Sequence, residues 1–209
     1  MAITSYSNLK TTIADFLNRD DLTAVIPTFI QLAESQMNRE VRHWQMENRV
    51  SGVQSQGDQY MQVPADWVET IRLHLTGNGT SVVELLSLSG MADKRAKSSD
   101  TSGTPVFYAH VRGEFELYPT PSGETNFELL YYQKIPALSD GTTTNWLLED
   151  APDVYLYGAL LHSAPYLQED SRLPVWAQMY AAAVQNLNNQ SERVKNSGTG
   201  IRLNIRGLG

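Results

Sequence analysis

The chain has 209 residues, 41% of them apolar, and it carries 23 acidic against 16 basic residues for a net charge of −7. This length fits one domain, or one domain with a large insertion, and the apolar share is enough to build a core. The negative charge argues against a protein that grips nucleic acid by neutralising phosphates. The absence of cysteine excludes disulfides and thiolate metal sites, and it fits folding in a reducing compartment.

Two further features bear on location. No stretch of the sequence approaches the run of about 18 apolar residues that a membrane span needs. The first residues, MAITSYSNLKTT, also lack a basic region followed by an apolar segment. We therefore expect neither a membrane-spanning helix nor a secretory signal.

The N-terminal third is predicted to form a helical hairpin, because apolar residues recur at helical spacing in residues 8–18 and again in residues 24–44. In the first helix these residues are Leu9, Ile13, Phe16 and Leu17. In the second helix they are Ile26, Ile30, Ala33, Met37 and Val41. Pro27 suits the first turn of this second helix, where a missing N–H is not needed.

From Met46 the apolar period changes to two, which is typical of strands. We predict strands in MENRVSGV, QYMQVP, ETIRLHL, SVVELL, PVFYAHV, GEFELYP and NFELLYYQKI. Gly52 and the run Gly77–Gly79 indicate breaks or turns between strands. Residues 89–103 are predicted as a polar connection with one helical turn. Because the strands follow one another as hairpins and meanders, the region 46–144 is predicted as an antiparallel, β-rich insertion.

Residues 145–197 are predicted to form a second helical hairpin, since a short connection between helices makes them antiparallel neighbours. In the first helix the apolar residues are Val154, Leu156, Leu160, Leu161, Ala164 and Leu167. In the second they are Trp176, Tyr180, Ala183 and Leu187. We expect Leu160 and Leu187 to lie in the core.

Helix ends in this region are marked by prolines and acidic residues. Pro152 follows Asp150, and Pro174 follows Asp170 and Ser171, which predicts two helix starts with capping side chains. Pro165 lies inside the first helical pattern, where it removes a backbone hydrogen bond. We therefore expect a kink or an early end near His162.

A search for chemistry in the sequence finds no convincing active site. The four histidines, His43, His74, His110 and His162, lie far apart and none has the spacing of a metal pair. Carboxylates gather at Glu149, Asp150 and Asp153 and again at Glu169 and Asp170, where a carboxylate pair or a Mg²⁺ site could be drawn. Helix capping explains both groups without catalysis. We predict no catalytic residue, no metal site and no cofactor.

Three stretches of the sequence carry a family resemblance: PTFIQLAESQMNREVRHWQME, YMQVPADWVETIRLHL, and the passage from GTPVFYAHV to SRLPVW. The most specific part is YYQKIPALSD…TNWLLEDAPDVYLYGALLHSAPYL, because of its order of elements and residue types. Together the stretches resemble the head-to-tail adaptor (connector) proteins of tailed bacteriophages and related prophages. The resemblance extends from about Asn8 to Asn196.

The resemblance implies an α+β fold in which two helical hairpins form a helical core around the β-rich insertion. Residues 1–197 would form one adaptor domain, helical over 1–45 and 145–197, with an extended C-terminal arm at 198–209. Such adaptors assemble as a ring of about twelve copies, in which one contact is repeated around an axis. The implied place is the head–tail junction of the virion, after synthesis in the host bacterial cytoplasm.

The implied partners are the portal protein of the capsid and a tail or tail-completion (nozzle or stopper) protein. Genome DNA would pass through the channel without specific binding, which fits a net negative charge that repels phosphates. No membrane is involved. Leu22, Val25 and Phe29 lie off the main apolar stripe of their helix and are candidates for the ring interface.

Family members commonly hold the portal with C-terminal arms, and residues 198–209 occupy that position here. Apolar and polar residues alternate in this tail, which predicts either a disordered segment or a strand that adds to another chain's sheet edge. The candidate portal-binding residues are Ile201, Arg202, Leu203, Asn204, Ile205 and Arg206.

Two alternatives from other classes stay open at this stage. The first is a carbohydrate- or ligand-binding module that uses tyrosines, chiefly those of the β-rich insertion, because tyrosine rings stack on sugars and bases. These tyrosines are Tyr108, Tyr118, Tyr131, Tyr132, Tyr155 and Tyr157. The second is a hydrolase built on the carboxylates of residues 149–153.

Overall fold

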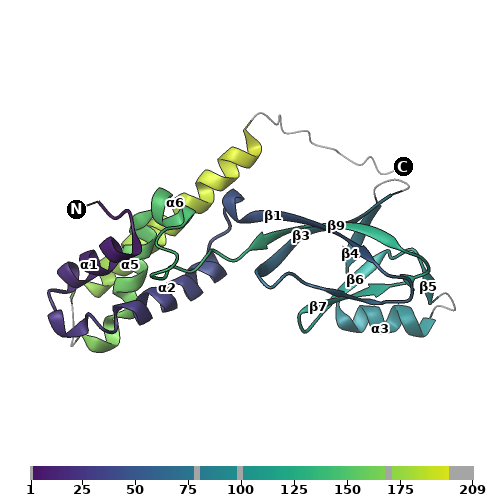
Figure 1. The fold of residues 1–209 in the computed structure, drawn as a ribbon, viewed down its shortest axis with the longest axis horizontal. Coiled ribbons are helices and arrows are strands. Elements are labelled where there is room, and N and C mark those ends of the chain that lie inside the picture. Colours follow the sequence, from purple (N-terminus) through teal and green to yellow (C-terminus); the bar gives the residue numbers. More distant parts are fainter. Residues whose placement is uncertain (1, 78–80, 98–100, 168–170, 198–209) are drawn as a thin grey trace, which may run out of the picture. The chain divides into compact units, whose positions relative to one another are not determined.

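The computed structural model describes residues 2–77, 81–97, 101–167 and 171–197 (Figure 1). The chain divides into two compact units, a helical unit from residues 1–45 and 135–209 and a β unit from residues 46–134. The fold is therefore mixed α+β, as the sequence predicted.

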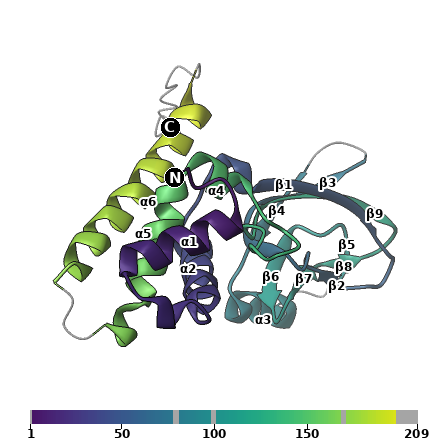
Figure 2. The same ribbon diagram turned by 60° about the vertical axis from the view of Figure 1, so that its left-hand side comes forward.

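The helical unit is built on α5, Pro152–His162. Its other helices are α1 (Tyr6–Leu17), α2 (Ile26–Glu40), α4 (Trp146–Asp150) and α6 (Leu173–Asn196), with short 3-10 turns at Asp20–Leu22, Trp44–Met46 and Ala164–Tyr166. Helix α5 packs against all four of the other helices, and Figure 2 shows it among them. It is therefore the central element of this unit.

The sequence of α5 explains its central place. Most of its residues are apolar, and six of the seven from Val154 to Leu160 are buried. A helix that is apolar on all sides is stable only where other elements cover it. Gly158 marks the closest approach, since a Cβ at this position would lie 3.1 Å from Met37 Cε and 3.2 Å from Tyr180 Cε2. The small residue lets α2 and α6 approach α5 closely.

The predicted apolar stripes of α1, α2 and α6 face this core. The five predicted stripe residues of the second helix are all buried, and so are Leu160 and Leu187, as predicted. Phe16 is an exception, because its side chain is exposed while Ile13 and Leu17 are buried. A stripe of three residues is sufficient to dock this short helix, and Phe16 lies outside it.

The helix ends confirm part of the prediction and correct part of it. As expected from Pro165, α5 ends at His162 and a 3-10 turn follows. Prolines do begin α5 and α6, but no side chain caps either helix. Asp150 is instead the last residue of α4, whose N-cap is Asn145. The Asn145 side-chain oxygen Oδ1 accepts a 2.9 Å hydrogen bond from the Leu148 N–H. Asp170 lies outside the described residues.

The β unit contains a seven-stranded sheet in the order β1-β9-β3-β4-β6-β7-β2 and a two-stranded sheet of β5 and β8. The strands of the large sheet are β1 (Glu47–Gln54), β2 (Tyr60–Gln62), β3 (Trp67–Thr76), β4 (Ser81–Leu85), β6 (Phe107–Val111), β7 (Glu114–Tyr118) and β9 (Thr125–Gln133). The small sheet pairs β5 (Ser102–Gly103) with β8 (Thr120–Pro121). The longest ladders join β9 to β1 and to β3, and both are antiparallel.

The expectation of a purely antiparallel sheet is wrong, because β4 and β6 are parallel, with Glu84 opposite Phe107. The pair β5–β8 is also parallel. Parallel neighbours need a crossover of a dozen or more residues. The polar connection supplies it, and the predicted single helical turn is in fact the helix α3, Leu88–Lys97. Along β6, α3 buries Met91 against Ala109 and Tyr118.

The sequence suggested that Gly52 breaks a strand, but this residue lies inside β1. It is opposite Phe127 of β9, and a Cβ at Gly52 would lie only 2.6 Å from Phe127 Cζ. The glycine therefore leaves room for the ring. The core of the sheet is a cluster of buried side chains from six strands: Met61, Leu73, Leu75, Val83, Tyr108, Phe115, Leu117, Leu129 and Tyr131.

The segment between β9 and α4 groups with the helical unit, so the β unit ends at Lys134 and not at residue 144 as expected. Two side chains of α2 bind its backbone. The Asn38 carbonyl accepts from the Ile135 N–H at 2.8 Å, and the Glu34 carboxylate accepts from the Leu138 N–H at 2.7 Å. The sequence of this segment gives no sign of these long-range partners.

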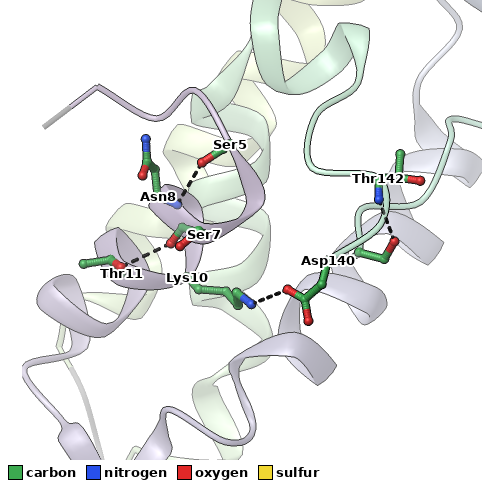
Figure 3. A network of polar contacts seen from close by, with 8 residues as sticks. Ser5, Ser7, Asn8, Lys10, Thr11, Asp140 and Thr142 are labelled. Atoms are coloured by element: carbon green, nitrogen blue, oxygen red, sulfur yellow. Dashed lines mark hydrogen bonds and ion pairs between the residues drawn. The ribbon is translucent and has the colours of Figure 1, made fainter.

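The same segment also contacts α1. The Tyr6 N–H donates to the Thr143 carbonyl at 2.7 Å. Figure 3 shows Lys10 of α1 reaching Asp140, with 3.0 Å between Nζ and Oδ1. Asp140 is exposed, so this ion pair contributes little to stability. The buried hydrogen bonds to α2 hold the segment more firmly.

A first prediction concerns the core of the helical unit. Leu160 is fully buried in α5. Replacing it with alanine should lower the free energy of unfolding by about 2–5 kcal/mol, because the methyl groups leave a cavity. Chemical denaturation of the two chains measures the difference. Leu161→Ala, at a half-buried position of the same helix, is the matched control and should cost less. Equal losses would contradict the packing of α5.

A second prediction concerns pH. Burial raises the pKa of Glu34, although the hydrogen bonds from Leu138 and Tyr155 act in the opposite direction. A carboxyl with a raised pKa binds its proton more tightly in the folded than in the unfolded chain. Its contribution to stability is therefore present below the ordinary glutamate pKa, about 4.3, and is lost as pH rises through the raised value.

The test compares the native chain with Glu34→Gln, which keeps the shape and the acceptor for the Leu138 N–H. From about pH 4 to pH 7 the native chain should lose stability relative to the variant, as measured by denaturation at each pH. A constant difference across this range would show that Glu34 does not titrate there.

Candidate functional site

The four histidines occupy four separate structural positions. His43 is buried, with its ring stacked on Trp146 at 5.1 Å between centroids. His74 on β3 lies 3.1 Å from the Glu128 carboxylate on β9. His110 packs among the aromatic rings of the β unit, and burial lowers its pKa, which favours the neutral imidazole. His162 shares a 3.0 Å hydrogen bond with Gln36. None of these positions brings two histidines together.

The carboxylates of α4 and α5 do not form an enclosed site. Glu149, Asp150 and Asp153 are all exposed, and Glu149 accepts a 3.0 Å hydrogen bond from the Thr144 hydroxyl. Within the part of the chain that the structure describes, no group of three acidic or histidine side chains could hold a metal ion. Glu169 and Asp170 lie outside the described residues. The exposed carboxylates lack the enclosure and partners that a hydrolase needs.

The tyrosines are mostly core residues. Tyr108, Tyr118 and Tyr131 are buried in the β unit, and Tyr155 is fully buried in α5. Tyr155 donates to Glu34 at 3.2 Å, and burial raises its pKa. Tyr132 is half-buried. Because rings inside a core cannot stack on a ligand, the structure does not favour a tyrosine-based binding surface.

The candidate ring-interface residues are mostly covered by their own chain. Leu22 is 5% exposed and Phe29 is 2% exposed, with the Phe29 ring 5.2 Å from that of Tyr166. Val25 is half-buried at the start of α2. Side chains that are already buried within the monomer do not offer a surface to a neighbour. Leu22 and Phe29 are therefore core residues, which corrects the expectation, and only Val25 stays partly available.

A groove of about 550 Å³ lies in the helical unit, between α2 and α6 and over α5. We call it the α6 groove and define it by ten residues: Gln36, Glu40, Leu161, Ala177, Tyr180, Ala181, Val184, Gln185, Asn188 and Asn189. The half of the groove near the N-terminal end of α6 is lined by alanines and aliphatic side chains. The other half of the groove is lined by amide side chains. The groove is open to the surface among the residues that the structure describes.

Hydrogen bonds hold the wall of the α6 groove. Glu40 accepts from the Tyr180 hydroxyl at 2.9 Å and from the Gln36 amide at 3.0 Å. Burial raises the pKa of Tyr180, so its hydroxyl keeps the proton that it donates. The Asn188 amide donates to the Glu40 carbonyl at 3.2 Å and accepts from the Arg42 N–H at 2.9 Å. The wall is thus fixed before any partner binds.

Another face of α6 carries an apolar strip that we call the α6 ridge, defined as Val175, Met179 and Ala182. Val175 is 52% exposed and Met179 is 48% exposed, and Ala182 is exposed as well. Met179 lies two residues from Ala177 and from Ala181, which at 3.6 residues per turn is about 200° around the helix. Met179 therefore faces away from the alanine-lined half of the groove, whereas Ala182 lies one turn before Gln185 and borders the amide half.

The sequence analysis missed both surfaces, although it contains a signal for the ridge. Val175, Met179 and Ala182 recur at spacings of four and three, beside the main stripe of Trp176, Tyr180 and Ala183. A second apolar series on one helix is unexpected if the helix packs on one side only. The groove has no comparable signal, because its wall is formed by helices distant in sequence.

A second hollow, of about 680 Å³, lies between α3 and the strands β6 and β7. Lys94 and Lys97 line it, with Phe107 and Tyr118. Lys94 Nζ lies 4.7 Å from the centre of the Phe107 ring. Arg95 beside it pairs with Glu116 at 2.8 Å, so part of this basic charge is used within the β unit. Asp93, on the same helix, also lines this hollow.

The C-terminal candidates Ile201 to Arg206 lie outside the described residues, as does the rest of the segment 198–209. None of the helices that the structure describes is both long enough and apolar enough to cross a membrane.

Comparison with known proteins supplies the family. A family model described as SU10 adaptor protein matches residues 4–202. No curated protein matches the chain. The family match covers nearly the whole chain and confirms the resemblance to phage head-to-tail adaptors, so the chain belongs to the SU10 adaptor protein family.

Proposed function

We propose that this protein is a structural component of a phage virion, a head-to-tail adaptor that joins the capsid portal to the tail. The observation that carries the proposal is the family match over residues 4–202. The family is one of phage structural adaptors and not a known enzyme family. The partners in this proposal are the portal protein and a tail or tail-completion protein.

In the proposed assembly about twelve copies form a closed ring through one repeated contact. Two helical hairpins, α1 with α2 and α5 with α6, would form the helical core of each copy. Genome DNA would pass through the ring channel without specific binding. The net charge of −7 supports this, because a predominantly acidic chain repels phosphates.

The proposal assigns residues 198–209 as the arm that holds the portal. The supporting observation is the sequence pattern, in which Ile201, Leu203 and Ile205 would lie on one side of an extended strand. So few residues cannot form a stable sheet alone, but they can add as a strand to an exposed sheet edge of the portal protein. Each arm would bind weakly, and repetition around the ring would raise the overall affinity.

The test of the function is assembly with the portal. The full chain is mixed with the portal protein of the same phage, and the complex is measured by native mass spectrometry and electron microscopy. We expect a ring of this protein on one face of the portal ring. The oligomeric state of the free chain does not decide the outcome. Failure to bind the portal at any protein concentration would overturn the proposed function.

The test of the arm uses a chain that ends at Ser197. We expect its melting temperature to be unchanged and its binding to portal rings to be lost. Ile201→Asp together with Leu203→Asp should have the same effect, because a charge cannot enter an apolar contact without cost. Thr11→Asp, at an exposed position of α1 outside the arm, is the control and should still bind. Normal portal binding by the truncated chain would contradict the arm assignment and would show that the helical or β unit makes the contact.

A further inference from the structure

We propose that the α6 ridge of one copy packs into the α6 groove of the next copy, and that this is the repeated contact of the ring. The inference rests on the proposed ring assembly and names the surfaces that form it. Met179, at the centre of the ridge, is the residue that enters the groove. Ala177 and Ala181 are the groove residues that receive it.

The arrangement of the two surfaces fits a ring. A closed ring of identical copies uses a heterologous contact, in which each copy offers one surface to the neighbour before it and a different surface to the neighbour after it. The two surfaces must therefore be different, complementary and directed away from each other. Met179 and the alanine-lined half of the groove meet these conditions, since Met179 is about 200° around α6 from Ala177 and from Ala181.

The shapes are complementary. Alanines in the groove allow a neighbouring helix to approach closely, and Leu161 and Val184 provide an apolar floor between them. Met179 is a long, flexible side chain of the kind that fills irregular apolar gaps. Val175 and Ala182 lie one turn on either side of it along the ridge. The exposed apolar area of the ridge would thus be covered by the apolar half of the groove.

Along α6, the ridge and the groove both change from apolar to polar residues at nearly the same position in the sequence. On the ridge side, Asn186 and Gln190 follow Ala182 and are exposed. On the groove side, Gln185 and Asn189 follow Ala181. Neighbours in a ring of many copies differ by a small rotation, so α6 helices that meet side by side run nearly parallel. Apolar residues then face apolar residues, and amides face amides, which can both donate and accept hydrogen bonds.

The fixed wall of the groove favours this contact. Glu40 holds both Tyr180 and Gln36 through hydrogen bonds of 2.9 and 3.0 Å. A partner that binds a surface already in its final form does not have to order it, and less free energy is lost on association. Glu40 has its hydrogen bonds within the monomer, so an apolar neighbour does not leave it without partners.

The test uses cysteine pairs, which the absence of natural cysteines makes selective. The double variant Met179→Cys with Ala181→Cys is made in the full chain, assembled with the portal and oxidised. The two cysteines of one chain point to opposite sides of α6 and cannot bond to each other. We expect disulfides between copies, seen as a ladder of covalent oligomers on a denaturing gel.

Three controls accompany the double variant. Met179→Cys alone and Ala181→Cys alone should give no ladder, because in the proposed contact neither residue meets its own copy. Thr11→Cys with Ala181→Cys pairs a groove residue with an exposed residue of α1 and should also give no ladder. Dimers from Met179→Cys alone would indicate a two-fold contact between ridges and would overturn the proposal.

A second experiment disrupts the contact by substitution. Met179→Asp should leave the melting temperature unchanged, because the side chain is already half exposed, and should abolish the ring seen by native mass spectrometry. Thr11→Asp should leave the ring intact. The native chain forms rings on the portal if it is an adaptor. If Met179→Asp forms the same rings and the cysteine pair gives no ladder, the ridge–groove contact is wrong, but the adaptor function stands. If the native chain never binds the portal, both proposals fail.

Discussion

The structure of the helical unit depends on the burial of the middle of α5, where six of the seven residues from Val154 to Leu160 are buried. This helix is apolar on all sides, and water must be excluded from each of them for the chain to fold. Helices α1, α2, α4 and α6 together meet that requirement, and Gly158 allows α2 and α6 to approach closely. Because α2 and α6 both lie against α5, their side chains meet above it and leave the α6 groove between them. The proposed interaction surface is thus a consequence of how the core is covered.

Polar groups inside this core determine where the chain enters it. Glu34 and Asn38 on α2 bind the backbone of the segment that leads from β9, and Tyr155 and Asn145 extend the same network, with 2.7 Å between the Asn145 amide nitrogen and the Tyr155 hydroxyl. Buried polar groups are costly unless each one finds a partner. The backbone amides of this segment provide these partners, so the segment has a fixed path although it contains no helix or strand.

A structural protein of a large assembly needs surfaces that remain open in the monomer, and catalytic enzymes need enclosed polar groups. The described residues fit the first requirement better. Histidines, tyrosines and carboxylates that could suggest chemistry are dispersed, buried in packing roles or exposed at the surface. Several large apolar side chains are exposed, among them Val175 and Met179 of α6, which are about half exposed. Exposed apolar residues that gather on one helix typically mark a contact with another protein.

The sequence by itself determined the local structure and the family. Periods of 3.6 and 2 identified most helices and strands, Pro165 predicted the end of α5, and the order of residue types indicated an adaptor. Only the tertiary structure decided the parallel pairing of β4 with β6, the partners of Glu34, and the burial of Leu22 and Phe29. The physical reason is that periodicity reports which side of an element is apolar. Which other element covers that side depends on contacts between residues far apart in the chain.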